Sequence, residues 1–222
     1  MDKVKIAIVG CGTISQLNVP GYLANSKCQV VALCDPDVDR AVSRAKEWGI
    51  SPRIYSTYEQ VLEDEKIDAV ELLTPTHMHA DQIVRGLESG KHVSCQKPLA
   101  STIAEAEVIT AAVRKSDKKF RITENFLHYP PIIKAKELLE SGAIGEPNML
   151  RMRTVRAKLS ESDFSIGEDA MKWRADATLQ AGGAMYDDGW HKYATAIRWL
   201  GEIESVQGII SNPDDREDEL PA

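Results

Sequence analysis

Three side chains of this sequence have the types and spacing needed to handle a proton. Lys97 follows a run that predicts a buried strand, and a lysine held there can hydrogen-bond a substrate hydroxyl and hold or move its proton. Asp187 and His191 are four residues apart, a spacing that puts both on one face of a helix. The carboxylate could then orient the imidazole, which can take a proton from an alcohol near neutral pH. A surface lysine and a solvated Asp–His pair fit the same residues, so both interpretations stay open.

A glycine-rich turn near the start of the chain could hold phosphates. Residues 10–15, Gly-Cys-Gly-Thr-Ile-Ser, fit the G-x-G-x-x-G/A pattern, with Ser15 in the third small position. The first glycine permits the tight turn, and the second lets the backbone approach a pyrophosphate at the N-terminus of the next helix. The predicted cofactor residues of this turn are Gly10, Gly12, Thr13 and Ile14.

The predicted second strand ends in an acid. Asp35 lies near the spacing at which a carboxylate accepts hydrogen bonds from the adenosine ribose hydroxyls. A carboxylate there repels a 2′-phosphate and so favours NAD, whereas the nearby cation of Arg40 leaves NADP open. A structural turn followed by a helix-capping aspartate is the alternative. We favour dinucleotide binding because the strand, the turn, the helix and the acid occur together.

Alternating strands and helices in the first half of the chain could carry these groups. Apolar and β-branched runs predict strands over 4–9, 29–35, 54–55, 67–74, 90–95 and 120–123. Helical patterns lie between them, at 17–23, from 38 to 49, from 56 or 57 onward, at 77–87 and at 104–113. This order predicts an α/β fold in which residues 1–123 form a doubly wound parallel sheet.

The candidate residues gather at the carboxyl ends of the predicted strands, where such sheets bind ligands. Thr74, Pro75 and Thr76 follow the fourth strand, and Gln96 and Lys97 follow the fifth. This coincidence is a stronger indication of a site than any single motif.

Residues 124–222 follow a different pattern. Helices are expected over 131–141 and from the glycines at 182–183 to 200, and strands over 149–155 and 205–210. We predict a truncated C-terminal α+β domain with an open antiparallel or mixed sheet. Because a two-stranded sheet is marginal by itself, we expect either that the chain is incomplete or that a partner completes the sheet.

Composition excludes several classes of partner. The 222 residues carry a net charge of −7 without a basic amphipathic stretch, which argues against nucleic acid and membrane surfaces. The N-terminus leaves no room for a signal peptide, and the four cysteines lack disulfide or C-x-x-C spacing, so a cytoplasmic protein with reduced thiols is expected. His77 and His79 have no further ligands at metal-site spacing, so no metal is predicted.

Three polar or aromatic residues near the junction of the two parts have two interpretations each. Asn125, Trp173 and Arg174 could supply an amide and a planar donor near the cofactor or substrate. A buried tryptophan with a paired arginine is the simpler account. Arginines 151, 153, 156 and 174 could suit an acidic substrate, or could simply be exposed.

The motifs GCGTIS, CDPD, LLTPTHMHADQI, CQKPLA, ENFLHYPP and GGAMYDDGWH occur in order, and the chain thereby resembles the Gfo/Idh/MocA oxidoreductase family. The resemblance implies an N-terminal Rossmann domain that binds NAD or NADP, followed by a C-terminal domain with a large open sheet. It implies hydride transfer between the cofactor and a secondary alcohol of a sugar, cyclitol or related polyol. Members commonly form homo-oligomers through that sheet.

The resemblance also implies roles for particular residues. Lys97 matches the lysine of the family's Glu-Lys-Pro motif, with Pro98 expected after a cis peptide. Asp187 and His191 match its D-x-G-x-H motif, in which the histidine is the general base and the aspartate and lysine position the hydroxyl. The segment expected on the nicotinamide side consists of Thr74, Pro75, Thr76 and His79.

Two departures from the family pattern stand out. Gln96 replaces the usual glutamate and removes a negative charge beside Lys97, which we expect to ease loss of the lysine proton. Superimposable pH–rate profiles for the native protein and Gln96→Glu would contradict this. The chain is also shorter than most relatives.

We therefore expect an NAD(P)-dependent dehydrogenase acting on CH–OH groups. Redox-assisted glycoside cleavage, which releases no net NADH, is one alternative. A non-catalytic nucleotide-binding module is the other, because the chain is short.

Overall fold

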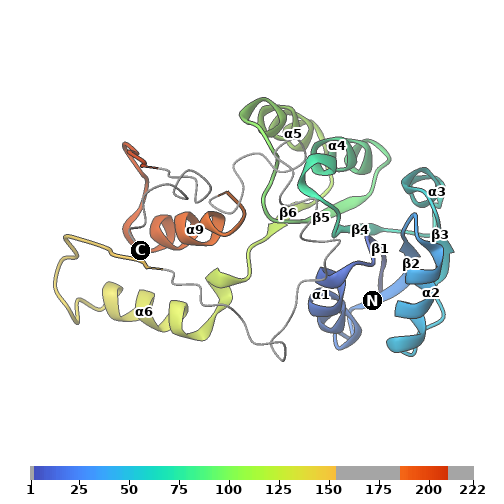
Figure 1. Ribbon diagram of the computed structural model, residues 1–222, viewed down its shortest axis with the longest axis horizontal. Coiled ribbons are helices and arrows are strands. Elements are labelled where there is room, and N and C mark those ends of the chain that lie inside the picture. The colour runs from blue at the N-terminus through green and yellow to red at the C-terminus, as the bar shows by residue number, and fades with distance from the viewer. Residues whose placement is uncertain (1–2, 154–185, 210–222) are drawn as a thin grey trace, which may run out of the picture.

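A single parallel sheet dominates the computed structural model, which describes residues 3–153 and 186–209. Its six strands lie in the order β3-β2-β1-β4-β5-β6, and all five neighbouring pairs are parallel (Figure 1). The strands are β1 (Val4–Val9), β2 (Cys28–Cys34), β3 (Arg53–Tyr55), β4 (Ala69–Leu72), β5 (His92–Gln96) and β6 (Phe120–Thr123). The predicted α/β fold with a Rossmann-like parallel sheet is confirmed.

The helices that connect the strands cover both faces of the sheet. They are α1 (Thr13–Leu23), α2 (Val38–Glu47), α3 (Tyr58–Glu63), η1 (Thr76–Met78), α4 (His79–Glu88) and α5 (Ile103–Lys115). One apolar cluster joins α1 and α2 to the sheet through residues such as Val19, Ala41 and Leu33. A second joins α3, α4 and α5 to the opposite face, for example through Val61 and Ile83. Alternate strand residues point to opposite faces, so continuous apolar runs supply both cores.

Local capping explains where several helices begin. The Asp37 carboxylate accepts the N–H of Arg40 at the start of α2. Capping boxes start α3, with Thr57 and Gln60, and α5, with Thr102 and Glu105. The helix predicted at 77–87 is divided, because one turn of 3-10 helix, η1, precedes α4.

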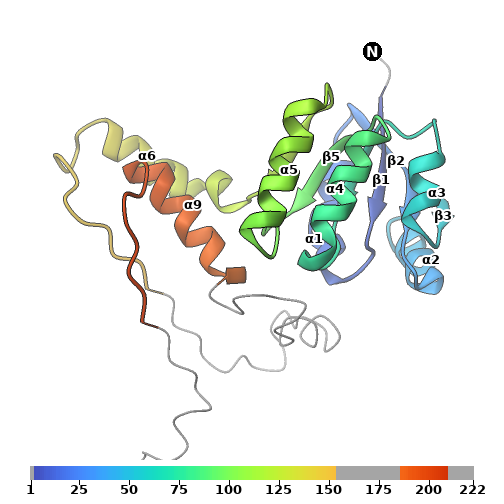
Figure 2. The ribbon, with the colours of Figure 1, turned by 90° about the horizontal axis from the view of Figure 1, so that it is seen from above.

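Three described elements of the second part of the chain lie beyond the β6 edge of the sheet (Figure 1). They are η2 (Phe126–His128), α6 (Pro130–Glu140) and α9 (Gly189–Leu200). Helices α6 and α9 lie side by side in both views (Figures 1 and 2), and the Trp199 indole donates to the Ile132 carbonyl across them at 3.2 Å. The helix predicted at 131–141 is confirmed.

The strands expected in this second part are wrong where the structure describes them. Residues 149–153 and 205–209 belong to neither helix nor strand, and the remainder of both predicted strands lies outside the described residues. A strand exists only through hydrogen bonds to a neighbour, and an alternating pattern cannot supply that neighbour. The type of sheet in the C-terminal domain is therefore not shown.

Two further findings concern the chain as a whole. None of the described helices has the length and apolar content needed to cross a membrane. Cys11, Cys28, Cys34 and Cys95 are free thiols. Burial raises the pKa of Cys11 and of Cys34 to about 12, and the nearby Asp35 carboxylate adds to both shifts, so these thiols are held in the unreactive protonated form.

Candidate active site

A cleft of about 1260 Å³ opens at the carboxyl ends of β1, β2, β4 and β5. We call it the strand-end cleft. It lies where the strand order reverses between β1 and β4, the place at which doubly wound sheets bind ligands. The predicted cofactor residues that line it are Gly10, Gly12, Thr13, Ile14, Asp35, Thr74, Pro75, Thr76, Gln96 and Lys97.

The glycine turn has the geometry of a phosphate cradle. Gly10 has φ +93°, and a Cβ at this position would lie 2.7 Å from the Leu73 carbonyl oxygen, so only glycine fits. A Cβ on Gly12 would meet nothing within 4 Å and would occupy space facing the cleft. No side chain among the described residues caps α1, whose N-terminus starts here. Exposed N–H donors and open space suit a pyrophosphate, so these residues fit a dinucleotide.

Asp35 is only 4% exposed, although it lines the cleft. Its carboxylate accepts the backbone N–H of Cys11 at 2.8 Å and that of Asp37 at 2.9 Å. The Arg40 guanidinium lies 3.5 Å from the same carboxylate. Asp35 thus joins the glycine turn to the end of β2 and places a carboxylate in the wall of the cleft.

Lys97 and Asp187 meet at one end of the cleft. The Lys97 ammonium donates to the Asp187 carboxylate at 2.7 Å and to the Asp187 backbone carbonyl at 3.0 Å. Both side chains are largely buried, at 15% and 22% exposed. The backbone before Lys97 is held by the Gln96 amide oxygen, which accepts the Lys97 N–H at 2.9 Å, and the Lys97–Pro98 peptide is cis as expected.

His191 is paired with a carboxylate that the sequence reasoning did not select. Its Nδ1 lies 2.8 and 2.9 Å from the two carboxylate oxygens of Glu124, which directly follows β6. Phe126 stacks on the imidazole with the ring centroids 4.1 Å apart. Asp187 lies two residues before α9, which begins at Gly189, and its carboxylate is bonded to Lys97. A shared helix face for Asp187 and His191 stays a prediction.

His79 is buried and contacts the segments that follow β4 and β5. The ring is 1% exposed, and its two nitrogens lie 2.8 Å from the Pro98 carbonyl oxygen and 2.9 Å from that of Thr74. Burial lowers the pKa of His79, and the two carbonyl contacts act against that shift. The histidine therefore ties the loop after β4 to the turn after β5.

Asn125, a further predicted site residue, is not among the residues that line the strand-end cleft. It precedes η2, where its carbonyl accepts the His128 N–H at 3.0 Å. Trp173 and Arg174 lie outside the described residues. Among the described residues, no group of three or more histidine, cysteine, aspartate or glutamate side chains could hold a metal ion.

Glu124 and two arginines are site residues that pattern reasoning missed. Arg44 lines the cleft, where its Nε donates to the Cys11 carbonyl at 3.2 Å, and Arg85 lines its far wall. Glu124 lies at the carboxyl end of a strand, so the rule that selected Lys97 could also have selected Glu124. It was overlooked because its partner, His191, is 67 residues away in the chain.

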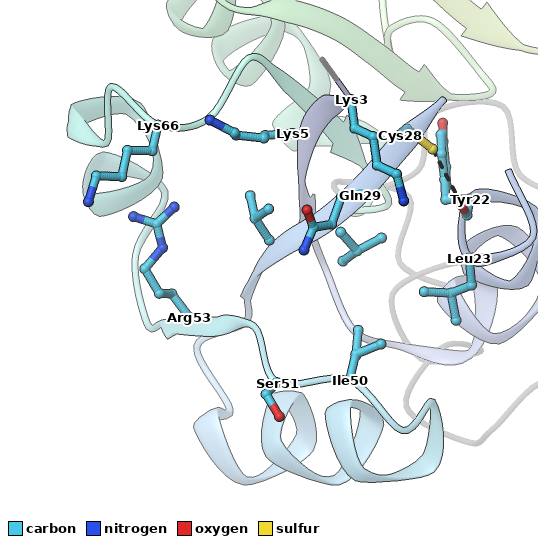
Figure 3. Close-up of a pocket in the computed structure, with 12 residues that line it drawn as sticks. Lys3, Lys5, Tyr22, Leu23, Cys28, Gln29, Ile50, Ser51, Arg53 and Lys66 are labelled. Atoms are coloured by element: carbon cyan, nitrogen blue, oxygen red, sulfur yellow. Dashed lines mark hydrogen bonds between the residues drawn. The ribbon is translucent and has the colours of Figure 1, made fainter. Parts of the chain in front are cut away.

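A second groove of about 680 Å³ lies at the amino ends of β1, β2 and β3, opposite the strand ends that line the first cleft. Figure 3 shows Lys66 and Arg53 on one side of it and Tyr22 and Leu23 on the other. Lys3 and Lys5 add positive charge. None of the predicted site residues lines this groove, so the strand-end cleft remains the candidate site.

Comparison with known proteins agrees with this geometry. The family description "Oxidoreductase family, NAD-binding Rossmann fold" (GFO_IDH_MocA) matches residues 4–124, and the GFO/IDH/MocA C-terminal domain matches residues 132–221. An uncharacterized oxidoreductase of Rhizobium meliloti is 30% identical over 94% of this chain and 60% of its own length. The scyllo-inositol 2-dehydrogenase (NAD(+)) of Bacillus subtilis is 29% identical over 95% of this chain and 59% of its own.

A solved structure is similar as well. A 3-ketoreductase from Actinomadura kijaniata in complex with NADP is 30% identical and superimposes with a TM-score of 0.60, covering 65% of this chain and 46% of that one. The chain spans about three fifths of the length of the two curated relatives.

Proposed function

Because the chain belongs to the Gfo/Idh/MocA oxidoreductase family, with an NAD(P)-binding Rossmann domain, we propose that it transfers hydride between NAD and a secondary alcohol. The substrate class is a sugar, a cyclitol or a related polyol, and the reaction acts on a CH–OH group. One observation carries the proposal. A lysine–aspartate pair, Lys97 with Asp187, stands at the end of a cleft that begins at the glycine turn between β1 and α1.

The cofactor would extend along the strand-end cleft. Its pyrophosphate would lie against Gly10, Gly12, Thr13 and Ile14, and its adenosine ribose beside Asp35. Thr74, Pro75, Thr76 and Gln96 would line the course toward the nicotinamide. When bound, NAD supplies the hydride acceptor, and the remaining steps belong to the side chains of this chain.

The charges at the ribose end favour NAD over NADP. Arg40 faces Asp35 at 3.5 Å and Asp37 at 3.2 Å. Arg44 and Arg85 are similarly paired, with Glu47 and with Glu59 and Asp81. A 2′-phosphate would have to compete with these carboxylates for each guanidinium, whereas ribose hydroxyls can donate to Asp35.

Lys97, Asp187 and His191 would handle the substrate hydroxyl. The ammonium of Lys97, held by Asp187, can donate a hydrogen bond to the hydroxyl oxygen and orient it. His191 would take the hydroxyl proton as the hydride departs, in line with the general-base role expected from the family. Buried charges paired in this way interact more strongly than they would in water.

The substrate class rests on similarity to named relatives. One similar protein is a scyllo-inositol 2-dehydrogenase, and other similar proteins include a levoglucosan dehydrogenase and a D-xylose 1-dehydrogenase. We extend to this chain only the shared chemistry, a secondary alcohol on a polyhydroxylated ring or chain. The rest of the proposal is a cytoplasmic protein that forms a homo-oligomer in its full-length form. Its nucleotide domain comprises residues 1–123, and residues 124–222 form a partial substrate domain.

A binding and turnover experiment tests this function. Calorimetric titration should give tighter binding of NAD than of NADP, and a panel of sugars and inositols should give NADH absorbance with at least one member. Replacing Lys97 by Met should lower kcat roughly a hundredfold or more, the usual range for a lost proton-handling group. The matched control is Lys134→Met on the exposed face of α6, which should leave kcat unchanged.

Three outcomes would contradict the proposal. Tighter NADP binding would overturn the argument from Asp35. Tight NAD binding without turnover on any panel member would favour a non-catalytic nucleotide-binding module. Cleavage of a glycoside without net NADH would favour redox-assisted glycoside cleavage.

A further inference from the structure

Glu124, the first residue of the ENFLHYPP motif, and His191, the last residue of GGAMYDDGWH, form a buried pair to which the resemblance assigned no joint role. The Glu124 side chain is 9% exposed and that of His191 is 10% exposed. The imidazole Nδ1 lies within hydrogen-bond distance of both carboxylate oxygens, at 2.8 and 2.9 Å. A single N–H on Nδ1 can be shared between these two oxygens as a bifurcated hydrogen bond, which directs Nδ1 toward the carboxylate.

The carboxylate is itself held in place. Glu124 also accepts the backbone N–H of Phe126 at 2.8 Å, which fixes it at the start of η2. Phe126 lies nearly parallel to the imidazole, at an interplanar angle of 14°. The same short segment therefore supplies both the acceptor for Nδ1 and a wall against the ring face.

The surroundings keep Glu124 ionised. Burial alone would raise the pKa of its carboxyl group, but the hydrogen bonds from His191 and Phe126 and the positive charge of Lys97 outweigh burial and lower that pKa. An ionised carboxylate can only accept hydrogen bonds. Its partner nitrogen must then carry the hydrogen.

We propose that Glu124 is a positioning residue that holds His191 in the tautomer with hydrogen on Nδ1, so that Nε2 is the ring nitrogen able to accept a proton. The inference rests on the proposed function for the direction of proton transfer. The tautomer itself is a property of the chain alone. In the step concerned, the substrate O–H proton goes to Nε2 while the carbon-bound hydride leaves to NAD, so charge and atoms balance. Glu124 remains ionised and stabilises the resulting imidazolium.

Other charged groups near the pair have separate partners. Asp187 is bonded to Lys97, and Lys192 pairs with Asp188 at 3.0 Å. The Lys192 ammonium lies over the ring of Phe126, 5.5 Å from its centroid. Glu124 is thus the carboxylate in hydrogen-bond contact with His191 among the described contacts.

Nitrogen NMR of the whole chain tests the tautomer without activity. Histidine is labelled with ¹⁵N, and long-range ¹⁵N–¹H spectra are recorded above pH 8, with His191→Asn used to assign the signal. The native protein should show protonated Nδ1 and unprotonated Nε2 at His191. Glu124→Gln should show both tautomers, because an amide can donate to Nδ1 as well as accept from it. Glu137→Gln, an exposed change on α6, is the matched control and should leave the native pattern.

Kinetics supplies a second readout. If the chain turns over a polyol, Glu124→Gln should lower kcat roughly a hundredfold with KM within about twofold, since general-base catalysis contributes on this scale. Glu124→Asp keeps the charge and should recover part of the loss.

A native His191 protonated at Nε2 would overturn the proposal. A Glu124→Gln protein with the native tautomer and native kcat would also overturn it. If Glu124→Gln does not fold, the native tautomer alone decides. Absence of dehydrogenase activity with the expected tautomer would contradict the proposed function and leave the positioning role of Glu124 supported.

Discussion

At the residue scale, the carboxylate of Asp35 has two roles that a single substitution removes together. It accepts two backbone N–H groups and faces Arg40, and it also lines the strand-end cleft. Removing the carboxylate therefore both loosens the turn and releases a cation toward the cleft.

We expect Asp35→Ser to weaken the binding of NAD. The ratio between the affinities for NAD and for NADP should become smaller. Loss of the charged acceptor should cost about 1.4 kcal/mol or more, or tenfold in Kd. Arg40, freed from Asp35, should offset part of this loss for NADP. Calorimetry with both cofactors measures the two effects. The exposed Asp39→Ser change in the first turn of α2 is the control, and equal losses for NAD and NADP would contradict the argument.

Residue-level prediction located residues that line the cleft, and their chemical roles stay predictions. The glycine turn was selected from its spacing pattern and Lys97 from its place at a strand end, and both line the cleft. The partner of His191 could not be derived in this way. Spacing pointed to Asp187, but that carboxylate is bonded to Lys97, and Glu124 reaches His191 only through the tertiary fold.

At the element scale, the turn from β1 into α1 contains two glycines, and each position favours glycine for a different structural reason. Gly10 adopts φ +93°, and a Cβ on it would collide with the backbone that follows β4, whereas Gly12 has ordinary backbone angles and a Cβ on it would meet nothing within 4 Å.

Alanine substitutions should therefore separate stability from binding. Gly10→Ala should destabilise the fold by about 2 kcal/mol or more, because a Cβ meets a carbonyl oxygen in a left-handed conformation. Gly12→Ala should leave the unfolding free energy within about 0.5 kcal/mol and weaken NAD binding at least about tenfold. Urea unfolding and NAD titration measure both, with Gly21→Ala on α1 as the control. Unchanged NAD binding by Gly12→Ala would contradict the cradle.

The start of α5 gives a second element-scale prediction. Thr102→Ala removes the hydroxyl that accepts the Glu105 N–H and should cost about 1 kcal/mol of stability. Thr110→Ala, at an exposed position inside the same helix, should be neutral or slightly stabilising. Chemical denaturation of the two variants checks the difference, and equal effects would argue against the capping box.

Prediction of elements succeeded where the pattern is reinforced by neighbours. All six strands of the sheet were expected, and the helix caps at Asp37 and Thr57 follow from local chemistry. The alternation at 149–155 resembled a strand just as closely. The prediction is wrong over 149–153. Alternating side chains indicate which face of a strand would be buried, but a strand also needs a neighbouring strand for its hydrogen bonds.

At the scale of the whole molecule, a buried acid affects how stability depends on pH. Glu71 on β4 is fully buried, and the Tyr22 hydroxyl donates to its carboxylate at 2.5 Å. Burial raises the pKa of Glu71, and contacts with Ser94, Tyr22 and Arg121 offset this only in part. The folded state therefore holds this proton more tightly than the unfolded state.

The protonated Glu71 carboxyl group contributes fully to the free energy of unfolding below the pKa that Glu71 has in the unfolded state. This contribution is lost as the pH rises through the pKa that Glu71 has in the folded state. Glu71→Gln carries no such dependence, so the variant should gain stability relative to the native protein between pH 5 and pH 8. Urea unfolding at the two pH values measures the difference. Glu107→Gln, on the exposed side of α5, should show no such trend. A constant gap between native and Glu71→Gln protein would contradict the role of burial.

The connection between the two halves has a consequence for the order in which the molecule forms. The sheet is built from successive strand–helix–strand units, whereas Lys97–Asp187 and Glu124–His191 join residues 90 and 67 positions apart. Contacts between distant positions form late, because long loops must close first. During synthesis from the N-terminus, the glycine turn and its sheet can fold before Asp187 and His191 have left the ribosome. A nascent chain can thus acquire its dinucleotide before it acquires the groups that would use it.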